Sequence, residues 1–342
     1  MRISRTARPT PPSSCTRSSD ERRVRRRADD DPGIQDYHTP VLVREVLALL
    51  EPERGGLFVD GTVGGGGHAR AILERAPGVH LVAVDRDPGA LAEAERTLAP
   101  FGDRVRFLLS DFRHAARAPE LDEGAVSGVL LDLGVSSRQL DHDRRGFAFR
   151  RGVPLDMRMD GSDARTASAA DVLNSYDEGD LARVFRELGE HRGAHRLARR
   201  IVRRRRTRPF AVSDDLVGAL RAAMGRSPAP RDKARVFQAL RLEVNDELGA
   251  LREGLDTLRD TMDAGGRMAV ISYHSLEDRE VKNRFREWSR DCTCPPALPV
   301  CVCAGRAAGE TLVRRPVRPA PTETSANPRA RSARLRAWRK TS

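Results

Sequence analysis

The sequence predicts an α/β fold with a mainly parallel sheet, and three observations indicate it. Short apolar runs recur between residues 57 and 132, and most of them end in an acidic residue and lead into a helical pattern. A glycine-rich turn follows the first run, and a later run, 266–273, resumes the sheet after a helical stretch. The early runs are 57–60, 79–85, 105–109 and 129–132. Because parallel strands end at one rim of the sheet, we expect a ligand site there.

The glycine-rich turn 61–67 joins the first strand, Leu57–Asp60, to a helix expected over 69–75. Glycine has no Cβ and tolerates positive φ, so the backbone can close around a ligand. Backbone N–H groups at the helix start can then face a polar ligand group. The spacing does not match the G-x-G-x-x-G fingerprint, which disfavours a nicotinamide dehydrogenase. A glycine-rich turn that binds nothing is the alternative.

Asp85 ends the second strand, eighteen positions after Gly67. An acidic residue at about this distance usually accepts hydrogen bonds from ribose hydroxyls. Its alternative role is to cap the helix that begins near Pro88, but Asp87 is better placed for capping. A nucleoside-containing cofactor at the rim is therefore the favoured interpretation.

The charge of the chain indicates a polyanionic partner. The 342 residues carry a net charge of +12, and the sequence pI is about 10.5. Almost all of the positive charge is arginine, a bias that a GC-rich coding sequence also produces, so the charge supports RNA binding without establishing it. No apolar run has membrane-spanning length, and we expect a soluble, cytoplasmic protein.

The composition divides the chain into a tail, a core and an insertion. Residues 1–34 are rich in Arg, Pro and Ser without periodicity, and we expect a disordered basic tail. We assign 35–139 and 246–342 to the core, and 140–245 to a helical insertion between the fourth and fifth strands. Helical patterns in the insertion lie at 169–174, 178–188, 194–206 and 213–223. A late strand with phosphate contacts is expected within 327–336.

One helical pattern in the insertion is strongly basic, because Ala194 to Arg208 holds eight Arg and no acidic residue. Leu197 and Ile201 are four residues apart and are expected to face inward. The arginines then expected on the outside are Arg196, Arg199, Arg200, Arg203 and Arg204. Such a face can contact RNA phosphates, and a merely solvated charged face is the alternative.

Several longer motifs resemble the RsmH (MraW) family, and the resemblance runs from about Tyr37 to the C-terminus. The motifs are 60–68, 85–88, 131–137, 154–160, 237–241, 272–279 and 327–332. The resemblance implies a Rossmann-like class I methyltransferase core with an inserted helical domain for the RNA substrate. It also implies transfer of a methyl group from S-adenosylmethionine to the exocyclic N4 of a cytidine in bacterial small-subunit (16S) ribosomal RNA. The expected target lies at the decoding centre, within an assembled or assembling 30S particle.

The resemblance implies a set of cofactor-binding residues, carried over one by one. They are Gly66, Gly67, His68, Asp85, Phe112, Asp132 and Gln139. Phe112 follows the third strand, where nucleoside sites often place an aromatic side chain against the adenine face. For His68, capping of the helix start is the alternative.

The catalytic residues are less evident from the sequence. Base amino-methyltransferases often carry Asn/Asp-Pro-Pro-aromatic after the fourth strand, whereas this chain has Asp132-Leu133-Gly134-Val135. The Asp132 side chain, or a backbone carbonyl of the 134–136 turn, is our hypothesis for the acceptor of the amine proton. His274 is a weaker acid–base candidate that could instead hold a loop. An unstacked target base could stack on Phe147, Phe149 or Tyr273.

The cysteines leave a metal site open. Four of them form a C-x-C…C-x-C set, for which a structural zinc and a reduced, metal-free loop are the alternatives. The four are Cys292, Cys294, Cys301 and Cys303. A methyltransferase acting on DNA or protein would share the cofactor half of the chain, and an RNA-binding assembly factor would share the arginines. The sequence does not predict the oligomeric state.

Overall fold

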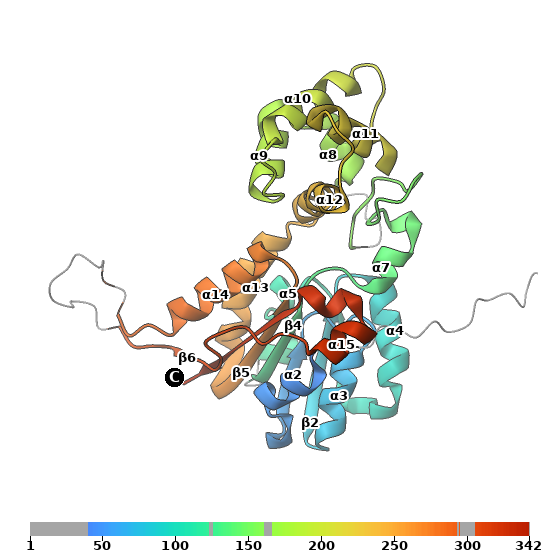
Figure 1. Ribbon diagram of the computed structural model, residues 1–342. Coiled ribbons are helices and arrows are strands. Elements are labelled where there is room, and N and C mark those ends of the chain that lie inside the picture. Colours follow the sequence, from blue (N-terminus) through green and yellow to red (C-terminus); the bar gives the residue numbers. More distant parts are fainter. Residues whose placement is uncertain (1–39, 123–125, 161–165, 293, 295–304, 342) are drawn as a thin grey trace, which may run out of the picture. The chain divides into compact units, whose positions relative to one another are not determined.

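The computed structural model describes residues 40–341 apart from 123–125, 161–165, 293 and 295–304. One seven-stranded sheet runs through the described part, in the order β3-β2-β1-β4-β5-β7-β6 (Figure 1). The strands are β1 Gly56–Asp60, β2 Val79–Asp85, β3 Val105–Leu109, β4 Val126–Asp132, β5 Met262–Ser272, β6 Gly309–Thr311 and β7 Arg334–Lys340. Strands β1 to β5 are parallel, and β7 is antiparallel to both of its neighbours. The predicted α/β class is confirmed.

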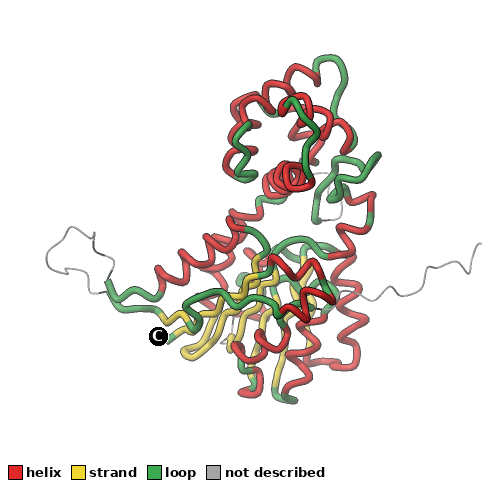
Figure 2. The backbone as a smooth tube through the Cα atoms, viewed as in Figure 1, coloured by secondary structure: helices red, strands yellow, loops and turns green. Residues whose placement is uncertain are grey.

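Helices cover both faces of the sheet. Successive side chains of each strand point to opposite faces, so each strand contributes to two cores. Phe58, Leu81 and Leu130 pack in one core with α2 (Val43–Leu50), α3 (Gly67–Arg75) and α4 (Pro88–Leu98). Their neighbours in the strands, among them Val59, pack in a second core with α13 (Glu247–Thr261) and α14 (Ser275–Trp288). Two short helices, α5 (Phe112–Ala115) and α6 (Pro119–Asp122), add to the second core. Figure 2 shows the strands in yellow with helices on either side.

The chain between β4 and β5 is mainly helical, as the apolar periodicity predicted. After α7 (Ser137–Asp141) come α8 (Ala169–Ser175), α9 (Glu178–Glu187), α10 (Ala194–Arg205), α11 (Ser213–Met224) and α12 (Pro230–Val244). We call α8 to α12 the helical cluster. Its apolar faces share a core of their own, with Phe185, Leu197 and Leu240 fully buried. Asp177 begins α9 by accepting a hydrogen bond from the Asp180 backbone N–H, as an N-cap residue does.

The late strand begins further along the chain than predicted. Residues Pro328–Ser332 form a 3₁₀ helix, η4, and β7 starts only at Arg334. Pro328 has no backbone N–H to offer a sheet, and the Asn327 side chain caps η4 by accepting from the Arg329 N–H. The other elements are η1 Pro52–Arg54, η2 Ala99–Arg104, η3 Asp143–Arg145 and α15 Pro321–Ala326. The predicted tail, 1–34, lies outside the described residues.

None of the helices in the described ranges combines the length and apolar character needed to cross a membrane.

Candidate active site

Three carboxylates lie at the carboxyl ends of neighbouring strands. Strand β1 lies between β2 and β4, and Asp60 at its end is level with Ala83 of β2 and Leu130 of β4. Asp85 and Asp132 therefore lie two residues further toward the end of the sheet. We call this edge, formed by the ends of β2, β1, β4 and β5, the carboxyl rim. It is where open α/β sheets bind ligands.

Asp60 is the deepest of the three carboxyl groups, with 1% of its surface exposed. Burial, aided by the charges of Asp132 and Asp85 and opposed by one hydrogen bond from the Thr62 N–H, raises its pKa to about 8. A carboxyl group with this pKa keeps its proton at neutral pH. Asp60 is thus a buried, protonated group beneath the carboxyl rim and is not one of its exposed reactive groups.

The glycine-rich turn wraps around the Asp85 side chain. The N–H of Gly64 donates to Asp85 Oδ2 at 2.9 Å, and that of Asp87 donates to Oδ1 at 2.8 Å. Gly66 begins α3 with a φ of +83°, which a side chain would strain. A Cβ on Gly67 would lie 3.0 Å from Pro40 Cγ. These two glycines therefore allow the turn to pack tightly within the protein, and its predicted approach to a ligand stays a prediction.

Asp85 does not cap the following helix. Asp87 takes that role, because its Oδ1 accepts a hydrogen bond from the Gly89 N–H at 3.0 Å. Burial raises the pKa of Asp85 to about 6, although two backbone hydrogen bonds oppose the shift. The carboxylate is ionised at neutral pH and stands at the end of β2, where it can accept hydrogen bonds from a ligand.

Asp132 is held from three directions at the end of β4. The Tyr273 hydroxyl donates to its Oδ1 at 3.0 Å, and His68 Nδ1 lies 3.6 Å from its Oδ2. Its backbone N–H donates to Thr62 Oγ1 at 2.6 Å. His68 is buried, and its Nε2 donates to the Val41 carbonyl at 2.8 Å. The structure thus brings His68 and Asp132 together, as well as Tyr273 from the turn after β5.

Phe112 and Gln139 lie on either side of Asp132 in the chain and make different contacts. The Phe112 ring packs against α13, since a Cβ on Gly254 would lie 2.5 Å from its Cδ2 and Cε2. Gln139 is buried, accepts from the Ser136 N–H at 3.0 Å and donates to Asp87 Oδ2 at 3.0 Å. Gln139 thereby ties the turn after β4 to the start of α4.

Further contacts, which the sequence did not predict, hold the segments around this connection. Arg145 Nη1 pairs with Asp87 Oδ2 at 2.9 Å, and Arg86 Nη1 donates to the Asn245 carbonyl at 3.1 Å. The Asn245 side chain is buried, donates to the Met157 carbonyl and accepts from the Met159 N–H. Arg86, Met157 and Met159 lie in the motifs 85–88 and 154–160, but the contacts themselves were not predictable, because the partners lie far apart in the chain.

His274 is the N-cap residue of α14. Its Nδ1 accepts from the Glu277 N–H at 3.4 Å, and its Nε2 lies 3.0 Å from Glu277 Oε1. The other Glu277 oxygen accepts from the Tyr273 N–H at 2.9 Å. Burial acts to raise the pKa of Glu277, but the adjacent His274 ring, the Arg241 charge and the hydrogen bond from the Tyr273 N–H outweigh it, and the pKa is lowered. These contacts fit the loop-holding alternative for His274, and they fix the turn that carries Tyr273.

The basic helix α10 exposes four of the five arginines predicted to face outward. The four are Arg196, Arg199, Arg200 and Arg203. Arg204 differs, because it is half-buried, pairs with Asp215 at 2.6 Å and lies over the Phe210 ring. Arg199 has an acidic partner as well, Glu178 at 3.3 Å. The run without acidic residues in the sequence is thus partly neutralised by neighbouring helices.

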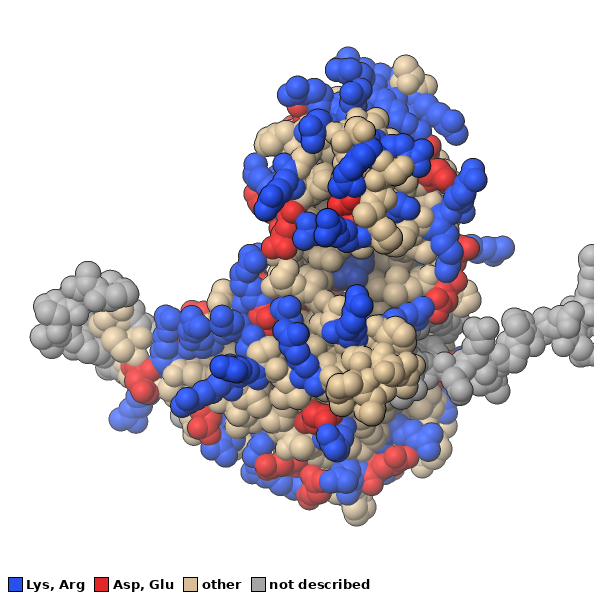
Figure 3. Space-filling model, viewed as in Figure 1, with Lys and Arg blue, Asp and Glu red and all other residues tan. Residues whose placement is uncertain are grey.

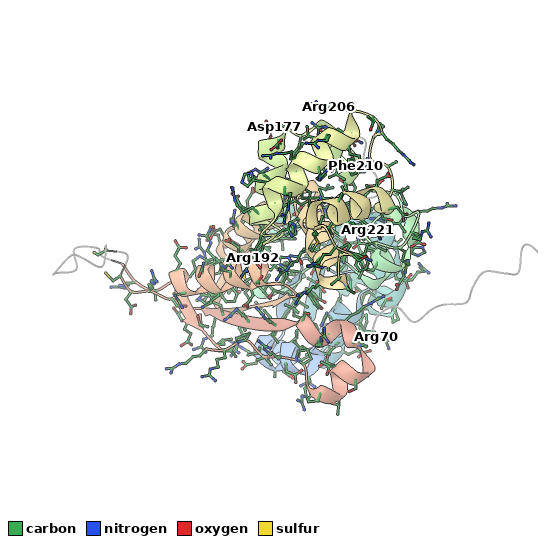
Figure 4. The ribbon with its side chains drawn as sticks, turned by 45° about the horizontal axis from the view of Figure 1, so that its top comes forward. Arg70, Asp177, Arg192, Arg206, Phe210 and Arg221 are labelled. Carbon is green, nitrogen blue, oxygen red and sulfur yellow. The ribbon has the colours of Figure 1, made fainter. Side chains whose placement is uncertain are left out.

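Positive side chains gather over the helical cluster on the face drawn in Figure 3. In Figure 4, Arg206 lies at the end of α10 and Arg221 on α11, whereas Arg70 lies on α3 beside the sheet. The C-terminal arginines are divided between paired and exposed ones. Arg334 and Arg336 both pair with Asp278, whereas Arg331 is exposed.

The cysteine set is only partly described. Cys292 is exposed and Cys294 is half-buried, whereas Cys301 and Cys303 lie outside the described residues. Within the described ranges, no three His, Cys, Asp or Glu side chains are grouped as metal ligands would be. The choice between a zinc site and a metal-free loop therefore stays a prediction.

Known proteins resemble the chain along most of its length. Residues 35–341 match the model of the MraW methylase family. A protein of Symbiobacterium thermophilum named ribosomal RNA small subunit methyltransferase H is 48% identical over 306 residues, which cover 88% of this chain and 96% of the relative. Proteins of the same name from Gemmatimonas aurantiaca and Syntrophotalea carbinolica are 50% and 51% identical. They match 89% of this chain and 95% and 98% of their own lengths.

Proposed function

Because the chain belongs to the MraW methylase family, we infer that it is an S-adenosylmethionine-dependent methyltransferase of small-subunit ribosomal RNA. We propose further that the methyl group goes to the exocyclic N4 of a cytidine in bacterial 16S RNA, at the decoding centre. The observation that carries this function is the carboxyl rim, where Asp132 is held by Tyr273 beside the glycine turn and Asp85.

The rim fits S-adenosylmethionine in the chemistry of its groups. Asp85 is an ionised acceptor for ribose hydroxyls, and Gly66 and Gly67 stand where side chains would strain or crowd the backbone. Phe112 and Gln139, next to the ends of β3 and β4, complete the proposed set with His68 and Asp132. When bound, the cofactor supplies a methyl group activated by its positively charged sulfur.

Residues of the protein have to make the exocyclic amine of cytosine reactive. The N4 lone pair of cytosine is delocalised into the ring, so N4 becomes a good nucleophile only when its N–H groups are accepted and its lone pair is aligned. Asp132 supports the role of acceptor, because its carboxylate stands at the rim in a fixed orientation. A backbone carbonyl of the 134–136 turn is the alternative acceptor. N4 would gain the methyl group as the bond between that group and sulfur breaks, and its proton would pass to the Asp132 carboxylate, or to solvent if a backbone carbonyl only accepts the N–H hydrogen bond.

Tyr273 supports Asp132 as a neutral donor. Burial, followed by the neighbouring Asp132 carboxylate, raises the pKa of Tyr273 above its ordinary value, so the hydroxyl keeps its proton. A tyrosine that keeps its proton can orient Asp132 but cannot serve as the base. His274 is the weaker candidate for acid–base chemistry, since both of its ring nitrogens face Glu277.

We assign the RNA to the helical insertion, 140–245. Arg196, Arg200 and Arg203 are exposed and make no ion pair within the described part of the chain, so they can contact phosphates. Arg199 and Arg204 would have to give up Glu178 and Asp215 to do so. The natural partner is then an assembled or assembling 30S particle in the cytoplasm.

The test uses tritiated S-adenosylmethionine, the purified protein and small-subunit particles from a strain that lacks the enzyme. Nucleoside analysis of the labelled RNA should place the label in N4-methylated cytidine. Label in another nucleoside would retain the methyltransferase activity and contradict the proposed target. Absence of label on every particle, with tight cofactor binding by calorimetry, would contradict the proposed substrate.

A further inference from the structure

Phe149 is one of two large apolar side chains that are exposed in the described part of the chain; 40% of its surface is accessible. The other, Leu109, lies at the end of the edge strand β3. A single exposed apolar residue is ordinary on a protein surface, so exposure alone carries no function. The surroundings of Phe149 carry the argument instead.

The Phe149 ring is held against α12 by an aromatic pair. Its centroid lies 5.8 Å from that of Phe237, with an interplanar angle of 69°, and Phe237 is 5% exposed. Lys233 lies one helical turn earlier on α12, and its Nζ is 5.7 Å from the centre of the Phe149 ring. Lys233 has no acidic partner among the residues that the structure describes. The ring therefore has a fixed apolar support, and an unneutralised cation lies over one of its faces.

The loop that carries Phe149 is fixed on both sides. Gly146 has a φ of +80°, and a Cβ there would lie 2.6 Å from the Pro154 carbonyl oxygen. Arg150 Nη2 donates to the carbonyls of Leu140 and Asp141, and the Arg150 carbonyl accepts from the Ser213 hydroxyl. A ring fixed in this way loses little conformational freedom when a ligand stacks on it.

Charge identifies the class of ligand. Lys233 is the unpaired cation at the ring, because the two arginines that follow Phe149 have acidic partners: Arg150 pairs with Asp143, and Arg151 pairs with Asp214 at 3.5 Å. An exposed aromatic ring next to cations is the arrangement with which proteins bind unpaired nucleotides, since the base stacks and the cation contacts the phosphate. An apolar protein partner would gain nothing from the unpaired charge of Lys233 at the ring.

We propose that Phe149 is a stacking platform for an unpaired base of the RNA substrate and that Lys233 contacts the adjacent phosphate. This inference rests on the proposed function, and it separates Phe149 from the two other aromatic candidates. Phe147 is buried in the core of the helical cluster, and the Tyr273 hydroxyl is bound to Asp132.

The base on Phe149 is a neighbour of the target, not the target itself. Phe237, which supports the ring, precedes Asn245 by eight positions along α12, about 12 Å of helix. Asn245 is the residue whose carbonyl contacts Arg86 next to the carboxyl rim. Loss of the platform should therefore weaken RNA binding and leave methyl transfer in the bound complex unchanged.

The test compares Phe149→Leu with Phe149→Trp in the full-length protein. Leucine keeps the apolar packing on Phe237 but removes the stacking face, so binding of unmodified small-subunit particles should weaken roughly 5- to 100-fold. Tryptophan should retain or improve binding. S-adenosylmethionine affinity, thermal stability and the single-turnover rate at saturating particle should stay at the wild-type values.

Salt dependence separates the two residues of the platform. Lys233→Gln should lower the slope of log affinity against log salt concentration by about 0.7, as loss of one phosphate contact does, whereas Phe149→Leu should leave it unchanged. Wild-type particle binding by Phe149→Leu would overturn the proposal. If the wild-type protein methylates no particle, the proposed function itself is contradicted. That outcome differs from the one in which only Phe149→Leu binds like the wild type.

Discussion

The Tyr273 hydroxyl donates a hydrogen bond to Asp132 Oδ1 at 3.0 Å, which joins the turn after β5 to the end of β4. Tyr273 is itself held, because its backbone N–H donates to Glu277. Glu277 lies near Arg241, the last-turn residue of α12 that is paired with Glu247 at 2.7 Å. A chain of polar contacts therefore runs from the helical cluster to the proposed catalytic carboxylate.

Removal of the Asp132 carboxylate should abolish most of the chemistry. In Asp132→Ala we expect a single-turnover rate at least about 100-fold below wild type, because the amine loses its acceptor. Tyr273→Phe should lower the rate less, about 10-fold, and should leave particle binding unchanged. Rapid-quench measurements with cofactor and particle both saturating test this. Full single-turnover activity in Asp132→Ala would shift the role to the backbone carbonyls of the 134–136 turn.

Binding of S-adenosylmethionine should weaken in mildly acidic solution. The pKa of Asp85 is about 6 in the protein, because burial opposes its ionisation. A ligand that donates hydroxyl hydrogens to the carboxylate binds the ionised form better, so its affinity should fall as the pH drops through 6, by up to about 10-fold per pH unit. Calorimetry between pH 5 and pH 7.5 measures this. Asp85→Asn should bind weakly at every pH, and an equally steep pH dependence in that variant would contradict the assignment.

Asp60 should make the folded protein less stable as the pH rises. Its pKa is about 8 in the folded state against 3.8 for the ordinary side chain. The folded state therefore holds a proton that the unfolded state releases, so this stabilisation is complete below pH 3.8 and is lost as the pH rises through about 8. Asp60→Asn should flatten this dependence and be the more stable protein at pH 9 by a few kcal/mol at most, since a tenfold difference in proton affinity corresponds to about 1.4 kcal/mol. Urea unfolding of both proteins at pH 6 and pH 9 checks it; equal pH slopes would refute the raised pKa.

Crowding of Phe112 by α13 should impair the proposed cofactor site. In Gly254→Ala, the new Cβ would meet the Phe112 ring at 2.5 Å, so the ring has to move. We expect S-adenosylmethionine affinity to fall several-fold, with a loss of about 1–3 kcal/mol in stability from overpacking. Gly218→Ala on α11 is the matched control, because its Cβ would meet nothing within 4 Å. The control should gain up to about 1 kcal/mol in stability and bind the cofactor normally.

The strands and most helices were predictable because their signals are local. Buried parallel strands such as Val79–Asp85 are continuous apolar runs, and the helices of the insertion carry one apolar face each. The protonated state of Asp60 was not predictable, since it depends on burial between strands that are distant in the chain. The pairing of Arg204 with Asp215 was missed for the same reason: the acid comes from a different helix.

The exposed arginines of α10 should contribute to RNA binding. Arg196, Arg200 and Arg203 are the ones without an ion pair in the described part of the chain, so they are the arginines available to RNA phosphates. Their simultaneous replacement by alanine should weaken particle binding and reduce the slope of log affinity against log salt by about 2, or about 0.7 for each contact. S-adenosylmethionine binding should not change. Filter binding across a series of salt concentrations measures the slope.

A matched triple variant distinguishes a binding face from general charge. Lys282, Arg286 and Arg290 are exposed on α14 or just after it, and like the three arginines of α10 they have no ion pair in the described part of the chain. Their replacement by alanine removes the same charge from a helix on the sheet. If RNA lies on the helical insertion, this control should keep the wild-type slope, because counterions are released only where phosphates are contacted. Equal loss in both triples would mean that the positive charge attracts RNA without a defined face on α10.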